Sequence, residues 1–137
     1  MTVKLITAFF FLIISSIVNA NSNSFKCIVL DAASVSSEGK LDMTNGFVNI
    51  YKDKKTEFVV DRGTGRILGK LISNHNPYGS PEILDRGSKN QSFKVLTIYK
   101  PFVQVDYLYI KSWVDAPKKP FYFLSMEGLI TGTCEDY

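Results

Sequence analysis

The sequence predicts an all-β fold, an antiparallel meander of about 7-8 short strands that forms a small barrel or a sandwich. Three observations lead to this class. Apolar and polar residues alternate with a period of two in several segments, turn-forming residues recur between those segments, and no stretch has a convincing amphipathic helical pattern. A cleaved N-terminal signal peptide is expected ahead of the β domain.

The first half of the domain begins with a strand at residues 25–30, which are apolar apart from Lys26. Residues 31–42 are polar and serine-rich, and they fit either a long loop or a short helical turn. Residues 47–51 alternate and are expected to form a second strand. A polar turn at 53–56 then leads into another strand at 57–60.

The segment 59–68 is the clearest local signal. Two apolar runs flank Asp61, Gly63 and Gly65, the residue types that tight hairpin turns require. A glycine-rich nucleotide site is the competing interpretation. The next glycine, Gly69, has the wrong spacing for it, and the following apolar run is too short for the helix that such a motif needs.

The second half contains the strongest alternation. A loop is expected at residues 73–81, and turns at 100–101 and 115–120 carry prolines where strands tolerate them. Four further strands are expected at residues 93–99, 103–113, 121–124 and 129–134.

The N-terminal segment reads as a signal peptide covering residues 1–20. Lys4 supplies the positive start, and residues 5–17 form an apolar run that ends before small residues at Val18 and Ala20. The run is shorter than the roughly 20 apolar residues that a membrane-spanning helix needs, so an uncleaved anchor is the weaker alternative. The exported chain would begin at Asn21, and residues 21–137 would form a single domain.

Cys27 and Cys134 are expected to form a disulfide. They are the 2 cysteines of the chain and lie near opposite ends of the exported part. In an oxidising compartment such a pair is normally bonded. The bond would tie the first strand to the last, which favours closure of the sheet.

Composition excludes several function classes. The formal net charge is only +3, whereas nucleic-acid-binding proteins usually show a strong basic excess. The single histidine, His75, excludes sites that need two imidazoles from one chain, and no cofactor or metal motif is present. No catalytic residues are assigned, so the protein is not expected to be an enzyme; a hydrolase that uses two scattered carboxylates is the residual alternative.

The candidate binding face consists of Tyr107, Tyr109 and Trp113. In the segment 107–110 both faces are apolar, because the tyrosines alternate with Leu108 and Ile110. A strand with one solvent-exposed face should carry polar residues on it. The alternatives are ordinary core and cross-strand aromatic packing, an outward binding face, or the lining of a ligand-filled barrel.

Several stretches together resemble small exported bacterial proteins that have no assigned activity. These are residues 58–61, 64–67 with Gly69, 91–95 and 132–134. The resemblance implies a bacterial source and a periplasmic or secreted β domain. It implies no activity and no functional residues.

The expected function is therefore that of a non-catalytic binding module in the periplasm or outside the cell. An unknown protein partner is the first expectation, and a small barrel that holds an apolar ligand is the alternative. Neither nucleic acid nor a stable membrane span is expected for the exported chain.

Overall fold

The computed structural model describes residues 22–53, 55–126 and 128–137. The predicted signal peptide lies outside these residues. Within the described part, no helix has the length and apolar character needed to cross a membrane.

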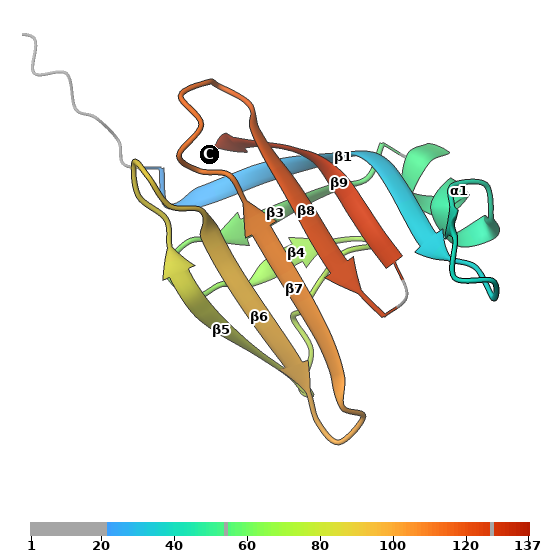
Figure 1. The fold of residues 1–137 in the computed structure, drawn as a ribbon. Coiled ribbons are helices and arrows are strands. Elements are labelled where there is room, and N and C mark those ends of the chain that lie inside the picture. The colour runs from blue at the N-terminus through green and yellow to red at the C-terminus, as the bar shows by residue number, and fades with distance from the viewer. Residues whose placement is uncertain (1–21, 54, 127) are drawn as a thin grey trace, which may run out of the picture.

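The described residues form one antiparallel sheet of nine strands and a short helix (Figure 1). The strand order is β4-β3-β1-β9-β8-β7-β6-β5, with β2 paired to β1. The sheet curls on itself into a half-barrel whose outer strands are β4 and β5. The predicted all-β antiparallel class is confirmed. The element bounds are β1 Ser24–Val35, β2 Leu41–Asp42, α1 Gly46–Asp53, β3 Glu57–Asp61, β4 Ile67–Gly69, β5 Gly79–Arg86, β6 Phe93–Tyr99, β7 Gln104–Ile110, β8 Lys119–Ser125 and β9 Gly128–Asp136.

The hydrophobic core fills the concave side of the sheet. Alternate residues of each strand point inward, as the period-two pattern predicts. Two edge-to-face aromatic pairs, Phe25 with Phe93 and Phe58 with Phe121, connect strands from distant parts of the chain. The core side chains are therefore packed across the sheet's curvature; the largest fully buried ones are Phe25, Phe58, Phe93, Ile67, Ile72, Leu108, Ile110 and Ile130.

Cys27 and Cys134 form the predicted disulfide. They lie directly opposite each other on β1 and β9, so the bond links two strands that are already hydrogen-bonded neighbours. Both cysteines are fully buried. The first and last strands of the described chain are thereby joined, and the bond indicates an oxidising, non-cytosolic environment.

The expected strand at residues 47–51 is wrong, because this segment lies in helix α1. The Asn45 side chain caps the helix by accepting a hydrogen bond from the Val48 backbone N–H at 3.1 Å. Phe47 and Tyr51, four residues apart, pack on the same face with ring centroids 4.9 Å apart. Val48 is fully buried. Helical spacing brings these three side chains together against the core, with Phe47 and Tyr51 half-buried, whereas an extended strand would place them on two faces.

The first strand is longer than the sequence indicates. β1 continues to Val35, through residues that the sequence left as a loop or helical turn. A bulge between Val29 and Asp31 places Leu30 outside the regular pairing with β9. The predicted hairpin at 59–68 is confirmed as β3 and β4, with Gly65 in a left-handed conformation at φ +74°.

Candidate binding surfaces

Tyr107 and Tyr109 lie on the convex, outer face of the sheet. They alternate along β7 with Leu108 and Ile110, which are buried in the core. Tyr122 of the neighbouring strand β8 stacks on Tyr109 with ring centroids 4.8 Å apart and an interplanar angle of 11°. Tyr107 lies on the other side of Tyr122, at 6.0 Å. Three tyrosines from two strands thus form one cluster on the outer face.

Leucines extend this cluster across four strands. The register aligns Leu96 of β6 with Tyr107, Tyr107 with Leu124 of β8, and Leu124 with Leu129 of β9. Residues aligned in this way share a face of the sheet. We call the set Leu96, Tyr107, Tyr109, Tyr122, Leu124 and Leu129 the tyrosine face.

Paired charges border the tyrosine face. The Lys94 ammonium lies 3.3 Å from an Asp85 carboxylate oxygen and 5.9 Å from the centre of the Tyr109 ring. Because the lysine and the aspartate neutralise each other, the border adds no large field of one sign. Burial is the main cause that raises the pKa of Tyr107, followed by the neighbouring Tyr122. The Tyr107 hydroxyl therefore stays protonated at neutral pH and is available as a hydrogen-bond donor.

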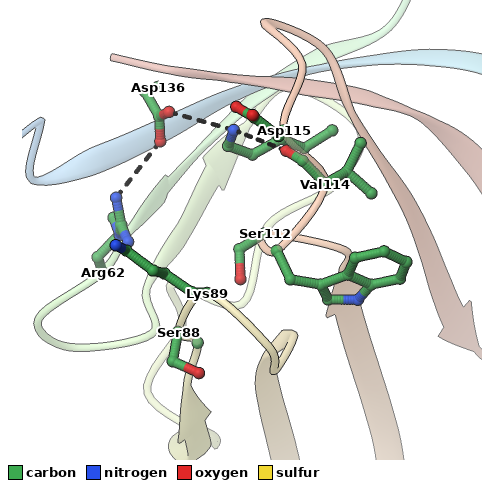
Figure 2. A pocket seen from close by; sticks show the side chains of 10 residues that line it. Arg62, Ser88, Lys89, Ser112, Val114, Asp115 and Asp136 are labelled. Carbon is green, nitrogen blue, oxygen red and sulfur yellow. Dashed lines mark hydrogen bonds and ion pairs between the residues drawn. The ribbon is translucent and has the colours of Figure 1, made fainter.

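Trp113 lies apart from β7, in the connection between β7 and β8. Strand β7 ends at Ile110, so the expected strand at 103–113 is too long at its C-terminal end. The indole N–H of Trp113 donates a hydrogen bond to the Ser92 hydroxyl at 3.1 Å, and the side chain is 46% exposed. Trp113 borders a polar cavity of about 660 Å³ at one end of the half-barrel (Figure 2).

Three of the charged residues that line this polar cavity are paired with one another. Arg62 and Lys119 both contact the Asp136 carboxylate, at 3.3 Å and 3.5 Å, and Figure 2 shows the contact of Asp136 with Arg62. The Arg62 guanidinium also lies over the Phe25 ring, 4.5 Å from its centre. These contacts connect the β3–β4 hairpin to the end of β9. The arrangement is that of a structural ion-pair network.

A groove is lined by residues of the β6–β7 and β8–β9 turns. Figure 1 shows these two turns at the opposite end of the half-barrel from the β7–β8 connection. The volume of the groove is about 320 Å³. Aromatic side chains from four separate segments line it, and Asp106 is the one charged residue among the lining residues that the structure describes. The lining residues are Tyr51, Leu71, Ile72, Ser73, Asn76, Tyr78, Tyr99, Phe102, Gln104, Asp106, Phe123, Ser125 and Met126.

Asp106 is buried at the inner end of this groove, with 5% of its surface exposed. The Tyr99 hydroxyl donates a hydrogen bond to its Oδ2 atom at 2.8 Å. The Gln104 amide donates a long hydrogen bond to Oδ1 at 3.4 Å. None of the ion pairs found among the described residues includes Asp106.

The rim of the groove is apolar and exposed. Tyr78 and Phe102 form an edge-to-face pair with ring centroids 5.7 Å apart, and they are 55% and 73% exposed. Met126, at the β8–β9 turn, also borders the groove and is 75% exposed. Large apolar side chains are thus concentrated in the turns that surround one opening.

The single histidine, His75, is exposed and lies in the loop before β5. Its backbone N–H donates to the Ser73 hydroxyl. Among the residues that the structure describes, no group of three or more His, Cys, Asp or Glu side chains is arranged to hold a metal ion.

Sequence reasoning missed the groove. Its acidic residue had a signal, because Asp106 occupies an inward position in β7 in line with Leu108 and Ile110. A carboxylate on an otherwise apolar face is unusual and marks a functional candidate. The aromatic partners had no such signal, since three complete strands, β3, β4 and β5, and most of β6 lie between Tyr51 and Tyr99 in the sequence.

Comparisons with protein-family models, with curated proteins and with solved structures give no match.

Proposed function

We propose that this protein is an exported, non-catalytic binding module, located in the periplasm or outside the cell, which captures a protein partner on its tyrosine face. The disulfide between Cys27 and Cys134 supports the compartment, because such bonds persist outside the reducing cytosol. The signal peptide predicted for residues 1–20 supports the route of export.

One observation carries the binding proposal: both faces of strand β7 are apolar over residues 107–110. Leu108 and Ile110 already contribute to the core. The outward tyrosines therefore add nothing to the concave core. The described helix, α1, packs beside β1 at the end of the sheet, so it does not cover the convex face of β7 and β8 (Figure 1).

The chemistry of the face indicates the kind of partner. Tyrosines provide a large apolar area together with hydroxyl groups, a combination enriched in protein interfaces. Charges such as Lys94 and Asp85 are paired at the border. We therefore expect an uncharged protein surface with apolar side chains at its centre and hydrogen-bond acceptors for the tyrosine hydroxyls. Lys94 and Asp85 would lie in the polar rim of the interface.

The test is a quantitative one on the exported form of the protein. The Tyr107→Ser/Tyr109→Ser double variant is compared with wild type for capture of proteins from the secreted or periplasmic fraction of the host. A captured partner is then purified and its Kd measured. We expect the double variant to weaken binding by roughly 30-fold or more, as loss of central aromatic anchors does.

Two controls make the result specific. Trp113→Ser removes the third candidate, which borders the polar cavity, and separates that cavity from the tyrosine face. Leu41→Ala removes an exposed apolar side chain in β2. Equal affinity of the double variant and wild type would refute the assignment. Self-association that is lost in the double variant would identify a second copy as the partner.

The alternative expectation, a bound apolar ligand, has its own support in the groove at the open end. Phe123 forms part of its wall and the exposed pair Tyr78 and Phe102 forms part of its rim. A cavity of this volume lies at the lower end of the range for small-molecule sites. Native mass spectrometry of protein from its own host compartment would test it, because a bound ligand adds mass to the bare chain. The bare mass alone would count against it.

A further inference from the structure

The groove combines two chemical features. One is the buried carboxylate of Asp106. The other is a set of aromatic side chains, among them Tyr51, Tyr78 and Phe102, that line the space in front of it. A buried charge is normally paired with an opposite charge, because removing it from water is costly.

The hydrogen bonds within the protein use only part of the carboxylate's capacity. An ionised carboxylate has about four acceptor positions. The described residues supply the Tyr99 hydroxyl at 2.8 Å and the Gln104 amide at 3.4 Å. Both donors are neutral, so the negative charge is not cancelled. Acceptor capacity therefore remains on the Asp106 carboxylate, which is one of the groups that line the groove.

The aromatic rings of the groove would attract a positively charged group, as the carboxylate would. The face of a phenol or phenyl ring attracts ammonium and guanidinium groups, more strongly where water is excluded. Burial is the first cause that raises the pKa of the Tyr51 and Tyr99 phenols. The nearby Asp106 carboxylate raises both pKa values further. The tyrosines thus stay uncharged beside Asp106, and they leave the carboxylate as the dominant charge in the groove.

We propose that the groove binds an organic cation, an ammonium or guanidinium group on an apolar stem, with the charged group at Asp106 and the stem between Phe102, Tyr78 and Met126. This inference rests on the groove being a ligand site, the second candidate above, and is independent of the tyrosine face. The groove's volume of about 320 Å³ suits one group the size of a lysine or arginine side chain.

A matched series of probes tests the charge requirement. Hexylamine, hexanol and hexanoate have the same stem and differ in the head group. Their Kd values are measured by NMR titration of the disulfide-bonded protein at neutral pH. We expect hexylamine to bind at least about tenfold more tightly than hexanol, as hydrogen bonds to a charged group are stronger than neutral ones. Hexanoate should bind most weakly.

Two variants locate the binding. Asp106→Asn keeps the shape and the acceptor for Tyr99, and we expect it to abolish the preference for hexylamine over hexanol. Its control is Asp115→Asn, a residue that borders the polar cavity at the other end. Phe102→Ala, at a rim position that is 73% exposed, should weaken hexylamine binding by about two- to fivefold. Its control is Leu41→Ala.

A stability readout separates a binding role from a structural one. Removal of an uncompensated buried charge should leave the melting temperature of Asp106→Asn unchanged or higher. A fall in melting temperature with the amine preference intact would show that Asp106 serves the fold. If Asp106→Asn does not fold, the probe series on wild type and Phe102→Ala still decides the question.

A set of peptides tests whether the cation is a side chain of a protein or a free amine. Blocked peptides with a central lysine or arginine are compared with the same peptide carrying glutamine. Tight binding of the peptides relative to hexylamine indicates a side chain of a partner protein, and the reverse indicates a free amine. Equal affinity for hexylamine and hexanol would refute the proposal that the ligand is a cation, and the groove would then be an apolar ligand site. If no probe binds, both the cation proposal and the interpretation of the groove as a ligand site are refuted.

Discussion

The Tyr99 hydroxyl donates a 2.8 Å hydrogen bond to the Asp106 carboxylate across strands β6 and β7. Both side chains are less than 10% exposed, at 7% and 5%. They stand where the apolar core ends and the groove begins. The bond therefore holds a buried charge at the inner wall of the groove, on two paired strands.

The buried, hydrogen-bonded state of Tyr99 should make the folded protein less stable at alkaline pH. Burial, and then the bond to Asp106, raises the pKa of Tyr99 above its usual value, which is about 10 in an unfolded chain. The folded state thus holds the phenolic proton more tightly than the unfolded state does. The resulting stabilisation is complete below about pH 10 and is lost as the pH rises above it.

Tyr99→Phe should remove this contribution. We expect the free energy of unfolding of wild type to fall more steeply between about pH 10 and pH 11 than that of the variant. Urea unfolding at a series of pH values measures the two slopes, with the exposed Tyr137→Phe as a control. Parallel slopes for wild type and Tyr99→Phe would contradict the argument.

Asn74 is expected to be one of the most sensitive polar positions. Its side chain is 2% exposed and accepts a 2.7 Å hydrogen bond from the Ile67 N–H. It also donates to the Gly65 carbonyl and the Thr97 hydroxyl, each at 3.0 Å. Asn74→Ala leaves three buried groups without a partner and should cost at least about 3 kcal/mol in urea unfolding.

Thr56 provides the opposite case. Its hydroxyl is buried and has no hydrogen-bond partner among the described residues. Thr56→Val replaces that hydroxyl with a methyl group of similar size and should raise the free energy of unfolding by about 1 kcal/mol. A loss of stability in Thr56→Val, or a change below 1 kcal/mol in Asn74→Ala, would show that these contacts are assigned wrongly.

Reduction of the disulfide should destabilise the protein strongly. The bond closes a sequence separation of 107 residues, for which the chain-entropy argument gives an upper value of about 4.7 kcal/mol. Differential scanning calorimetry of the oxidised protein and of Cys27→Ala/Cys134→Ala measures the difference in melting temperature. Equal melting temperatures, or two thiols that react with an alkylating reagent in freshly exported protein, would refute a stabilising bond.

Much of the fold was predictable because strand periodicity is a local property. Strand β6 has the predicted bounds, and the Asp61–Gly65 turn follows from its residue types. Helix α1 was not predicted, because residues 47–51 were interpreted as an alternating strand and so short a stretch spans little more than one helical turn. Its apolar residues at 47, 48 and 51 share one face only in a helix. The deciding signal was Asn45, whose side chain caps the helix.

The groove was less predictable because its residues meet only through sheet curvature. The inward position of Asp106 follows from the alternation in β7. That Tyr51 of α1 and Tyr78 of the loop before β5 line the same space depends on how far the sheet curls. No periodicity in the sequence reports that curvature, so only the acidic residue could have been singled out.

The position of the disulfide also has a mechanical consequence. Cys27 and Cys134 lie within a few residues of Ser24 and Tyr137, whose backbones are hydrogen-bonded at 2.9 Å. Tension applied between these two residues would pass through the sulfur–sulfur bond and bypass the strands between them. While the bond is intact, pulling on both ends could extend only the short flanking segments, and the half-barrel and its groove would carry no load.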